Sequence, residues 1–195
     1  MNDDAHHIRA FIAISLPKEI RKFLKDLQRQ LRASGIKASW PKPETMHLTL
    51  KFLGNISISK LDTFKTCMAR AITGIPIHTL SVSGIGVFPT VKKTRVIWFG
   101  IRGQTDILEK LANRLEFILF EEMEIKMENR RFSPHLTIAR VKKPIFPKTM
   151  IKRLQEFRDF HSEEFFVSEI KLFQSELLSS GAIHKIIFSV PLQMH

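Results

Sequence analysis

Nearly the same tetrapeptide occurs twice in this chain: HLTL at 47–50 and HLTI at 135–138, 88 positions apart (135 − 47). Each copy begins a stretch in which polar and apolar residues alternate, the pattern of a strand with one buried face. The surroundings repeat as well, because His47 to Ile77 and His135 to Phe165 both span 30 positions (77 − 47 and 165 − 135). This self-similarity indicates a duplicated unit, which limits the possible folds more strongly than a single motif would.

Hydrophobic periodicity predicts the same element order in each half: strand, helix, strand, helix, strand. Strands are predicted at 8–16, 47–53, 77–88, 95–101, 135–141 and 165–173, with a last strand at 183–190. Helices are predicted after Pro17, after a capping Ser59, across Leu108–Leu119 and after Pro147. No linker separates the halves, so we expect one bilobal domain over 1–195, with pseudo-repeat halves at about 8–90 and 94–190.

The duplicated His-x-Thr places a histidine and a threonine on the same face of each strand, because side chains alternate along a strand. Two copies of one unit tend to pack about a pseudo-two-fold axis. We therefore expect His47 and Thr49 to face His135 and Thr137 across a central cleft. This set suits a phosphate, since threonine hydroxyls donate to phosphate oxygens and imidazoles serve as general base and general acid near neutral pH.

A metal site is the alternative chemistry for two histidines. Zinc takes three or four ligands, usually with cysteine or carboxylate support. Neither strand carries Asp, Glu or Cys beside its histidine. We therefore expect neither a metal nor another cofactor.

The charge balance indicates which classes of partner the chain can bind. Lys and Arg outnumber Asp and Glu by 31 to 19 in 195 residues, giving a net charge of +12, a surface that attracts RNA, DNA or anionic membrane. Hydrophobic residues make up 44 %, enough for a packed core, and the single Cys67 cannot form an intrachain disulfide. The chain shows neither a signal-peptide pattern nor an apolar run long enough to span a bilayer. We expect a cytoplasmic monomer that does not enter membranes.

The residues around both copies resemble the 2H phosphoesterases, and within them the bacterial and archaeal RNA 2′,3′-cyclic phosphodiesterases, also called 2′-5′ RNA ligases. The similarity covers nearly the whole chain and is carried by RAFIAISLP (9–17), WPKPETMHLTLKFLGN (40–55), GIGVFP (84–89), RRFSPHLTIAR (130–140) and EIKLFQSEL (169–177). It implies a bilobal α+β fold with two antiparallel sheets around a cleft. It also implies an enzyme that opens RNA 2′,3′-cyclic phosphate ends, including those of tRNA fragments, to 2′-phosphates; some members run the reverse 2′-5′ ligation.

The resemblance also implies roles for individual residues. His47 would be the general acid that protonates the departing 3′ oxygen, and His135 the general base that activates water. Thr49 and Thr137 would hold the non-bridging phosphate oxygens, with help from Arg140. Phe11 occupies the family's aromatic position on the first strand, where a base could stack; a plain core phenylalanine is the alternative.

Further expectations concern the rim and the last strand. Arg130, Arg131, Lys92, Lys93, Lys142 and Lys143 are expected to form a basic rim that attracts phosphates. The chain has no tyrosine, and His184 stands near the place where the family often has one in its last strand. Two other functions stay open: a 2H enzyme acting on a small cyclic nucleotide, and an RNA-binding module without catalysis.

Overall fold

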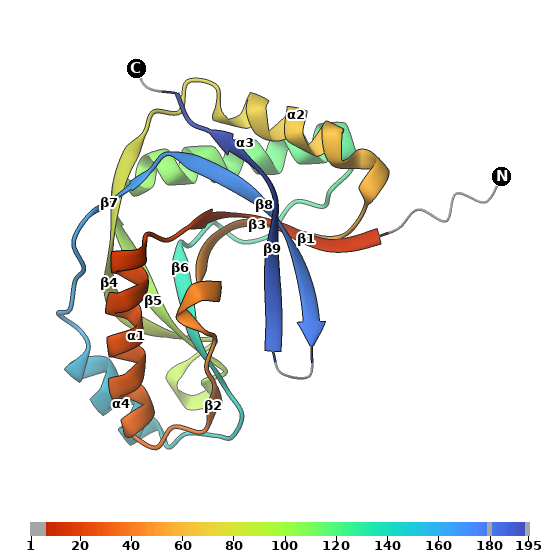
Figure 1. The fold of residues 1–195 in the computed structure, drawn as a ribbon. Coiled ribbons are helices and arrows are strands. Elements are labelled where there is room, and N and C mark those ends of the chain that lie inside the picture. The colour runs from red at the N-terminus through yellow and green to blue at the C-terminus, as the bar shows by residue number, and fades with distance from the viewer. Residues whose placement is uncertain (1–6, 179–180, 194–195) are drawn as a thin grey trace.

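The computed structural model describes residues 7–178 and 181–193, and these fold into two antiparallel sheets with four α-helices (Figure 1). The strands are β1 (His7–Ser15), β2 (Ala38–Ser39), β3 (His47–Ser57), β4 (His78–Phe88), β5 (Val96–Gly103), β6 (His135–Val141), β7 (Phe165–Val167), β8 (Glu169–Leu178) and β9 (Gly181–Pro191). The α-helices are α1 (Lys18–Ala33), α2 (Leu61–Ile72), α3 (Thr105–Met123) and α4 (Pro147–Glu156), with short 3-10 turns η1 (Pro43–Thr45), η2 (Ile58–Lys60) and η3 (Val91–Lys93).

The predicted helices are present, and the apolar stripes of α1, α2 and α3 face the core, whereas in α4 Met150 is buried and Ile151 is exposed. In α1 the spacing of three and four residues buries Ile20, Leu24, Leu27 and Leu31. The predicted Ser59 cap of α2 is wrong. Ser59 lies inside η2, and α2 begins at Leu61 without a capping side chain, because Ser57 accepts a hydrogen bond from the Ser59 amide (3.3 Å) and starts the 3-10 turn first.

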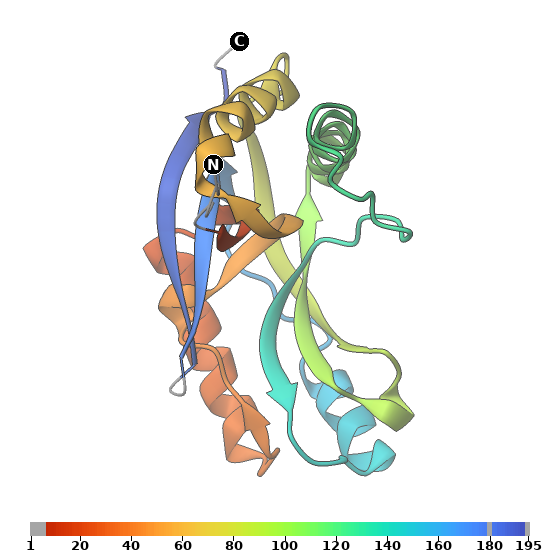
Figure 2. The ribbon, with the colours of Figure 1, turned by 90° about the vertical axis from the view of Figure 1, so that its right-hand side faces the viewer.

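The two sheets show the same order of strands once the duplication is taken into account. One sheet runs β3-β1-β8-β9 and the other β2-β6-β5-β4-β7. β3-β1-β8 in the first corresponds to β6-β5-β4 in the second, so the third strand of each repeat lies in the other repeat's sheet. Figure 2 shows the sheets as two layers. Because neither sheet is complete without this exchange, we propose that the chain folds as one domain of two lobes.

One predicted strand is divided between the two sheets. The stretch predicted at 165–173 breaks at Ser168: β7 pairs with β4, whereas β8 pairs with β1 and β9. The chain therefore passes from one sheet to the other within a few residues. Local periodicity shows that both pieces are extended but does not show which partner each one takes.

Alternation along β1 separates the core from the face that carries the first histidine. Ala10, Ile12 and Ile14 point into the main core, which extends through both sheets and the helices. Phe11 and Ala13 point to the opposite face, where they form a small separate cluster with Phe173 of β8. The α+β class and the two antiparallel sheets are thus confirmed. None of the helices in the described part of the chain combines the length and the apolar character that a bilayer crossing needs.

Candidate active site

The two His-x-Thr strands share one backbone irregularity. On β1, Ala13 lies opposite Thr49 and Ile12 opposite Lys51, so Leu50 has no partner and forms a bulge. On β5, Trp98 lies opposite Thr137 and Ile97 opposite Ala139, so Ile138 is the equivalent bulge. In each strand the histidine and the threonine are half-buried and have a buried leucine between them. The two residues after the threonine are both buried, and the next one is exposed. The duplication extends to the local distortion of the backbone.

Both histidines are held by the same hydrogen bond. Nδ1 of His47 lies 2.8 Å from the carbonyl oxygen of Thr45, and Nδ1 of His135 lies 2.8 Å from the carbonyl oxygen of Ser133. A carbonyl oxygen can only accept, so Nδ1 carries the proton in both rings. Nε2 is therefore the nitrogen left to exchange a proton with a ligand. This is the geometry that a pair of acid–base histidines needs.

Aromatic rings surround His47. Its ring stacks on Phe11, with centroids 4.4 Å apart, and meets His184 of β9 edge-on at 5.0 Å. Phe11 also stacks on Phe173 at 5.1 Å and is only 3 % exposed. A base could stack on Phe11 only if these neighbours moved. The geometry therefore supports the alternative for Phe11, a packing residue behind His47.

Burial lowers the pKa of His47 to about 4, and the positive charges of His184 and Arg140 add to this shift, while the hydrogen bond to Thr45 opposes it. His47 is therefore neutral at pH 7 in the ligand-free protein. Burial also lowers the pKa of His184. Among the described residues, the buried Nδ1 of His184 has no hydrogen-bond partner.

His135 has a different set of neighbours. Phe88 of β4 meets its ring edge-on at 5.1 Å, and Trp98 of β5 lies 6.2 Å away. Trp98 lies across the strand from Gly86, and a Cβ at Gly86 would overlap its ring. Glycine at this place therefore leaves room for the large Trp98 ring near the second histidine.

Contact between β3 and β6 joins the two sheets at the site, although the strands belong to different sheets. Burial is the main cause of the lowered pKa of His47 on β3, and the positive charge of Arg140 on β6 makes a smaller contribution to it. Neither the Thr49 nor the Thr137 hydroxyl is bonded to another described residue, and both side chains are half-buried. The structure thus brings the strands of the two copies into contact, and that all four predicted residues face one ligand stays a prediction.

The position two residues after each bulge is occupied by a different type of residue in the two strands. Phe52 follows the first bulge and is 58 % exposed, whereas Arg140 follows the second and is also exposed. The two strands therefore offer a phosphate only one guanidinium between them. Both residues stand five positions after their histidine (52 − 47 and 140 − 135), so the sequence already aligns them, and the structure adds that both are exposed.

Lys51 is a residue that sequence reasoning missed. Its ammonium group is buried and donates to Glu116 Oε2 and to the carbonyl oxygen of Lys126, both at 2.7 Å. Glu116 Oε2 also accepts from the Glu128 amide at 3.2 Å. Lys51 therefore ties the strand of the first histidine to α3 and to the segment that leads to the second. Lysine at an alternating strand position is expected to be exposed, and only the bulge turns it inward.

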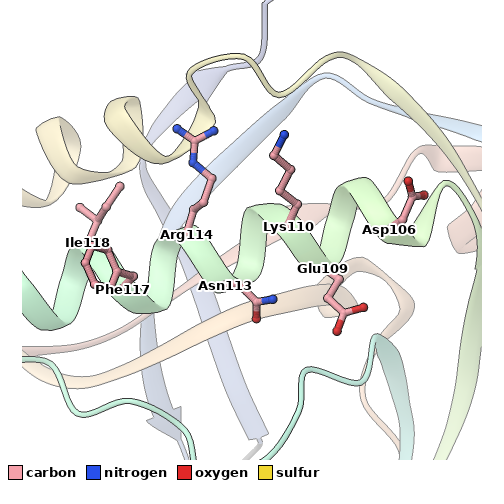
Figure 3. A pocket seen from close by; sticks show the side chains of 7 residues that line it. All are labelled: Asp106, Glu109, Lys110, Asn113, Arg114, Phe117 and Ile118. Carbon is pink, nitrogen blue, oxygen red and sulfur yellow. The ribbon is translucent and has the colours of Figure 1, made fainter.

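The expected basic rim is divided. Arg131 is bonded to Glu109 of α3 (2.8 Å), away from Lys92, Lys93, Lys142 and Lys143, which lie near the end of β6. One hollow follows α3 (Figure 3) and a second lies over β4 and β5; neither is lined by His47 or His135. The described residues include no group of three or more His, Cys, Asp or Glu placed to hold a metal. Catalysis without metal stays a prediction.

Comparisons with known proteins agree with this geometry. The model of the family described as LigT-like phosphoesterase matches twice, at residues 14–98 and 102–184, one match for each repeat. A relative from Thermotoga maritima, named RNA 2′,3′-cyclic phosphodiesterase, is 32 % identical over 93 % of this chain and 94 % of its own. A relative of the same name from Methanocaldococcus jannaschii is 32 % identical over 92 % and 98 %.

Solved structures share the fold. A Thermus thermophilus protein superposes with a TM-score of 0.77 at 26 % identity, covering 96 % of this chain and 99 % of that one. E. coli LigT complexed with 3′-AMP superposes with a TM-score of 0.75 at 24 % identity, covering 97 % and 100 %. With matches over both repeats and relatives over nearly its whole length, the chain belongs to the LigT-like phosphoesterase family.

Proposed function

We propose that this protein hydrolyses RNA 2′,3′-cyclic phosphate ends to 2′-phosphates, with His47 and His135 as an acid–base pair. The observation that carries the proposal is the matched hydrogen bond from Nδ1 of each histidine to a backbone carbonyl oxygen, which leaves both Nε2 atoms for proton transfer. The relatives named RNA 2′,3′-cyclic phosphodiesterase support the choice of substrate.

The reaction needs one proton removed and one supplied. His135 takes a proton from water as the water oxygen attacks phosphorus. His47 gives a proton to the 3′ oxygen as the bond between phosphorus and that oxygen breaks, leaving a 3′-hydroxyl and a 2′-phosphate. If a 5′-hydroxyl replaces water, the same step forms a 2′-5′ linkage, which is the ligation that the proposal includes.

Thr49 and Thr137 donate their hydroxyls to the non-bridging oxygens, and Arg140 balances the negative charge that builds up on them. Charge at these oxygens increases during attack, so donors fixed by the strand bulges stabilise the transition state. Both threonines reach the phosphate from opposite strands, which would hold it between the two imidazoles.

His47 can act as the acid only if substrate binding protonates it. Its pKa of about 4 in the free protein makes it neutral at pH 7. A bound phosphate places negative charge beside the ring and raises its pKa, since an opposite charge favours the protonated form. Binding should then take up a proton at pH 7 and weaken as pH rises through the pKa of the bound state.

Phosphorus NMR tests the proposed reaction. A short RNA ending in a 2′,3′-cyclic phosphate is incubated in EDTA with the wild type, His47→Ala or His135→Ala. A 2′-phosphate formed by the wild type alone is the expected result, and a 3′-phosphate would contradict the assigned leaving group. Turnover lost in EDTA and restored by a metal would contradict the metal-free mechanism.

The same experiment separates the other functions. RNA bound without turnover would indicate a binding module, and turnover of cyclic mononucleotides in preference to RNA would indicate a small-nucleotide enzyme. One chain carries both His-x-Thr copies, so we propose that the active form is a monomer, which sedimentation at assay concentration would check.

A further inference from the structure

One end of the β2-β6-β5 sheet gathers positive charge from three separate segments. These segments, 37–44, 90–95 and 140–143, contain eight Lys and Arg residues and one acid, Glu44. We call the eight the cationic edge: Lys37, Lys42, Lys92, Lys93, Arg95, Arg140, Lys142 and Lys143. All eight are exposed, and none forms a salt bridge with a described residue.

Backbone pairing brings these segments side by side. The Lys142 amide donates to the carbonyl oxygen of Lys37 (2.9 Å), and the Val141 amide donates to that of Arg95 (2.8 Å). Arg140 lies opposite Ser39 of β2 on one side and Val96 of β5 on the other. The three charged segments therefore lie next to one another at one end of the sheet. Their separation in the sequence hides this, because they are brought together only by the sheet.

The cationic edge begins at the active site. Arg140 belongs to both, since it is one of the eight cations and lies on β6, the strand that begins with His135 and contacts the strand of His47. A polyanion whose end lies at the two histidines could therefore run along the cationic edge and stay close to positive charge.

One segment at the opposite end of the molecule carries the opposite charge. Residues 116–131, the end of α3 and the segment after it, contain five Glu and three Lys or Arg, a net charge of −2 (3 − 5). The three segments of the cationic edge have a net charge of +7 (8 − 1). Figures 1 and 2 place α3 at one end of the molecule and α4, beside the cationic edge, at the other. RNA phosphates would be repelled from this acidic segment and attracted to the cationic edge.

We infer that the cationic edge binds the phosphates of the RNA strand that lie 5′ to the cyclic end, so that the enzyme prefers oligonucleotides to mononucleotides. This inference rests on the proposed function and adds to it the path of the strand. Neutralising phosphates releases counterions, so the affinity for RNA should fall as the salt concentration rises. In a plot of log K against log [salt], each contacted phosphate of a single strand should add about −0.7 to the slope.

The test compares substrates of increasing length. Wild type should show a kcat/KM that rises from a 2′,3′-cyclic mononucleotide to an RNA of about eight nucleotides, mainly through KM, and that falls more steeply with salt for the longer RNA. Lys92→Gln/Lys93→Gln/Lys142→Gln/Lys143→Gln should lose most of this length advantage and part of the salt slope, and should turn over the mononucleotide like the wild type.

A matched control removes four charges at the other end. Lys60, Lys65, Lys110 and Lys126 are exposed on or beside α2 and α3, so their replacement by Gln changes the net charge equally. The control variant should keep the length advantage. An equal loss in both variants would mean a general charge effect and would overturn the inference, as would a wild type that shows no length advantage.

Binding without chemistry separates this inference from the proposed function. Fluorescence anisotropy with a labelled RNA that ends in a 2′-phosphate reports affinity whether or not the protein is a hydrolase. Weaker binding by the cationic-edge variant and unchanged binding by the control would support the edge even if hydrolysis failed. Turnover of cyclic RNA together with equal binding by all three proteins would overturn the edge and leave the hydrolase standing.

Discussion

β3 and β6 have the same backbone but different surroundings. Both place His-x-Thr before a bulge, and both fix the histidine through a carbonyl oxygen two residues earlier. His47 lies among Phe11, Phe173 and His184, whereas His135 lies against Phe88 and Trp98. Duplication thus supplies two equivalent histidine positions, and their unlike neighbours are the basis on which we propose different tasks for them.

Removing each histidine tests whether both are needed. His47→Ala and His135→Ala should each lower kcat by about 10²- to 10⁴-fold, the usual contribution of general acid–base catalysis. The double variant should lose little more, because the pair acts as a unit. Single-turnover rates with a cyclic RNA would measure this. Losses that simply multiply would contradict a coupled pair.

The threonines test whether the two strands hold the phosphate equally. Thr49→Val and Thr137→Val keep the shape of the side chain and remove the hydroxyl. A hydrogen bond to a charged group contributes about 1.5–3 kcal/mol, so each change should lower kcat/KM by about 10- to 150-fold. A loss from only one variant would restrict phosphate binding to one strand.

The residues after the bulges test the largest chemical difference between the strands. Arg140→Gln should lower kcat/KM by about tenfold. The loss stays moderate because water competes with an exposed guanidinium for the phosphate. The substitution should also raise the pKa of His47, whose ring then loses a nearby positive charge. Phe52→Gln should change neither quantity. Kinetics and an NMR titration of His47 provide both measurements, and equal effects of the two changes would remove the distinction.

His184 gives the smallest expected effect. Its charge helps to lower the pKa of His47, so His184→Tyr should raise that pKa and move the acidic limb of the kcat/KM profile to higher pH. The maximal rate should change less than in the other variants. An unmoved acidic limb would show that His184 is electrostatically silent.

Sequence patterns predicted the secondary-structure elements and the duplicated motif, but not how the strands pair. Period-two and period-3.6 patterns located the elements, and the duplication placed His47, Thr49, His135 and Thr137 correctly on their strands. The same patterns could not assign β4 and β8 to exchanged sheets, because strand pairing depends on contacts far apart in the chain.

The bulges mark where residue-level prediction failed. An extra residue reverses the alternation, so Lys51 turns inward and Phe52, like Arg140, is exposed. Phe11 was located on the correct strand, but its exposure depends on rings from three other strands, β3, β8 and β9. Motifs identified what is duplicated, whereas the differences between the copies needed the tertiary structure.

The division of labour between the histidines has one direct test: a substrate in which sulfur replaces the bridging 3′ oxygen. A thiolate leaves without a proton, so this substrate removes the need for a general acid. His47→Ala should recover most of its lost rate on the sulfur substrate relative to the oxygen substrate, and His135→Ala should not. Recovery of His135→Ala instead, or of neither variant, would contradict the assignment of His47 as acid and His135 as base.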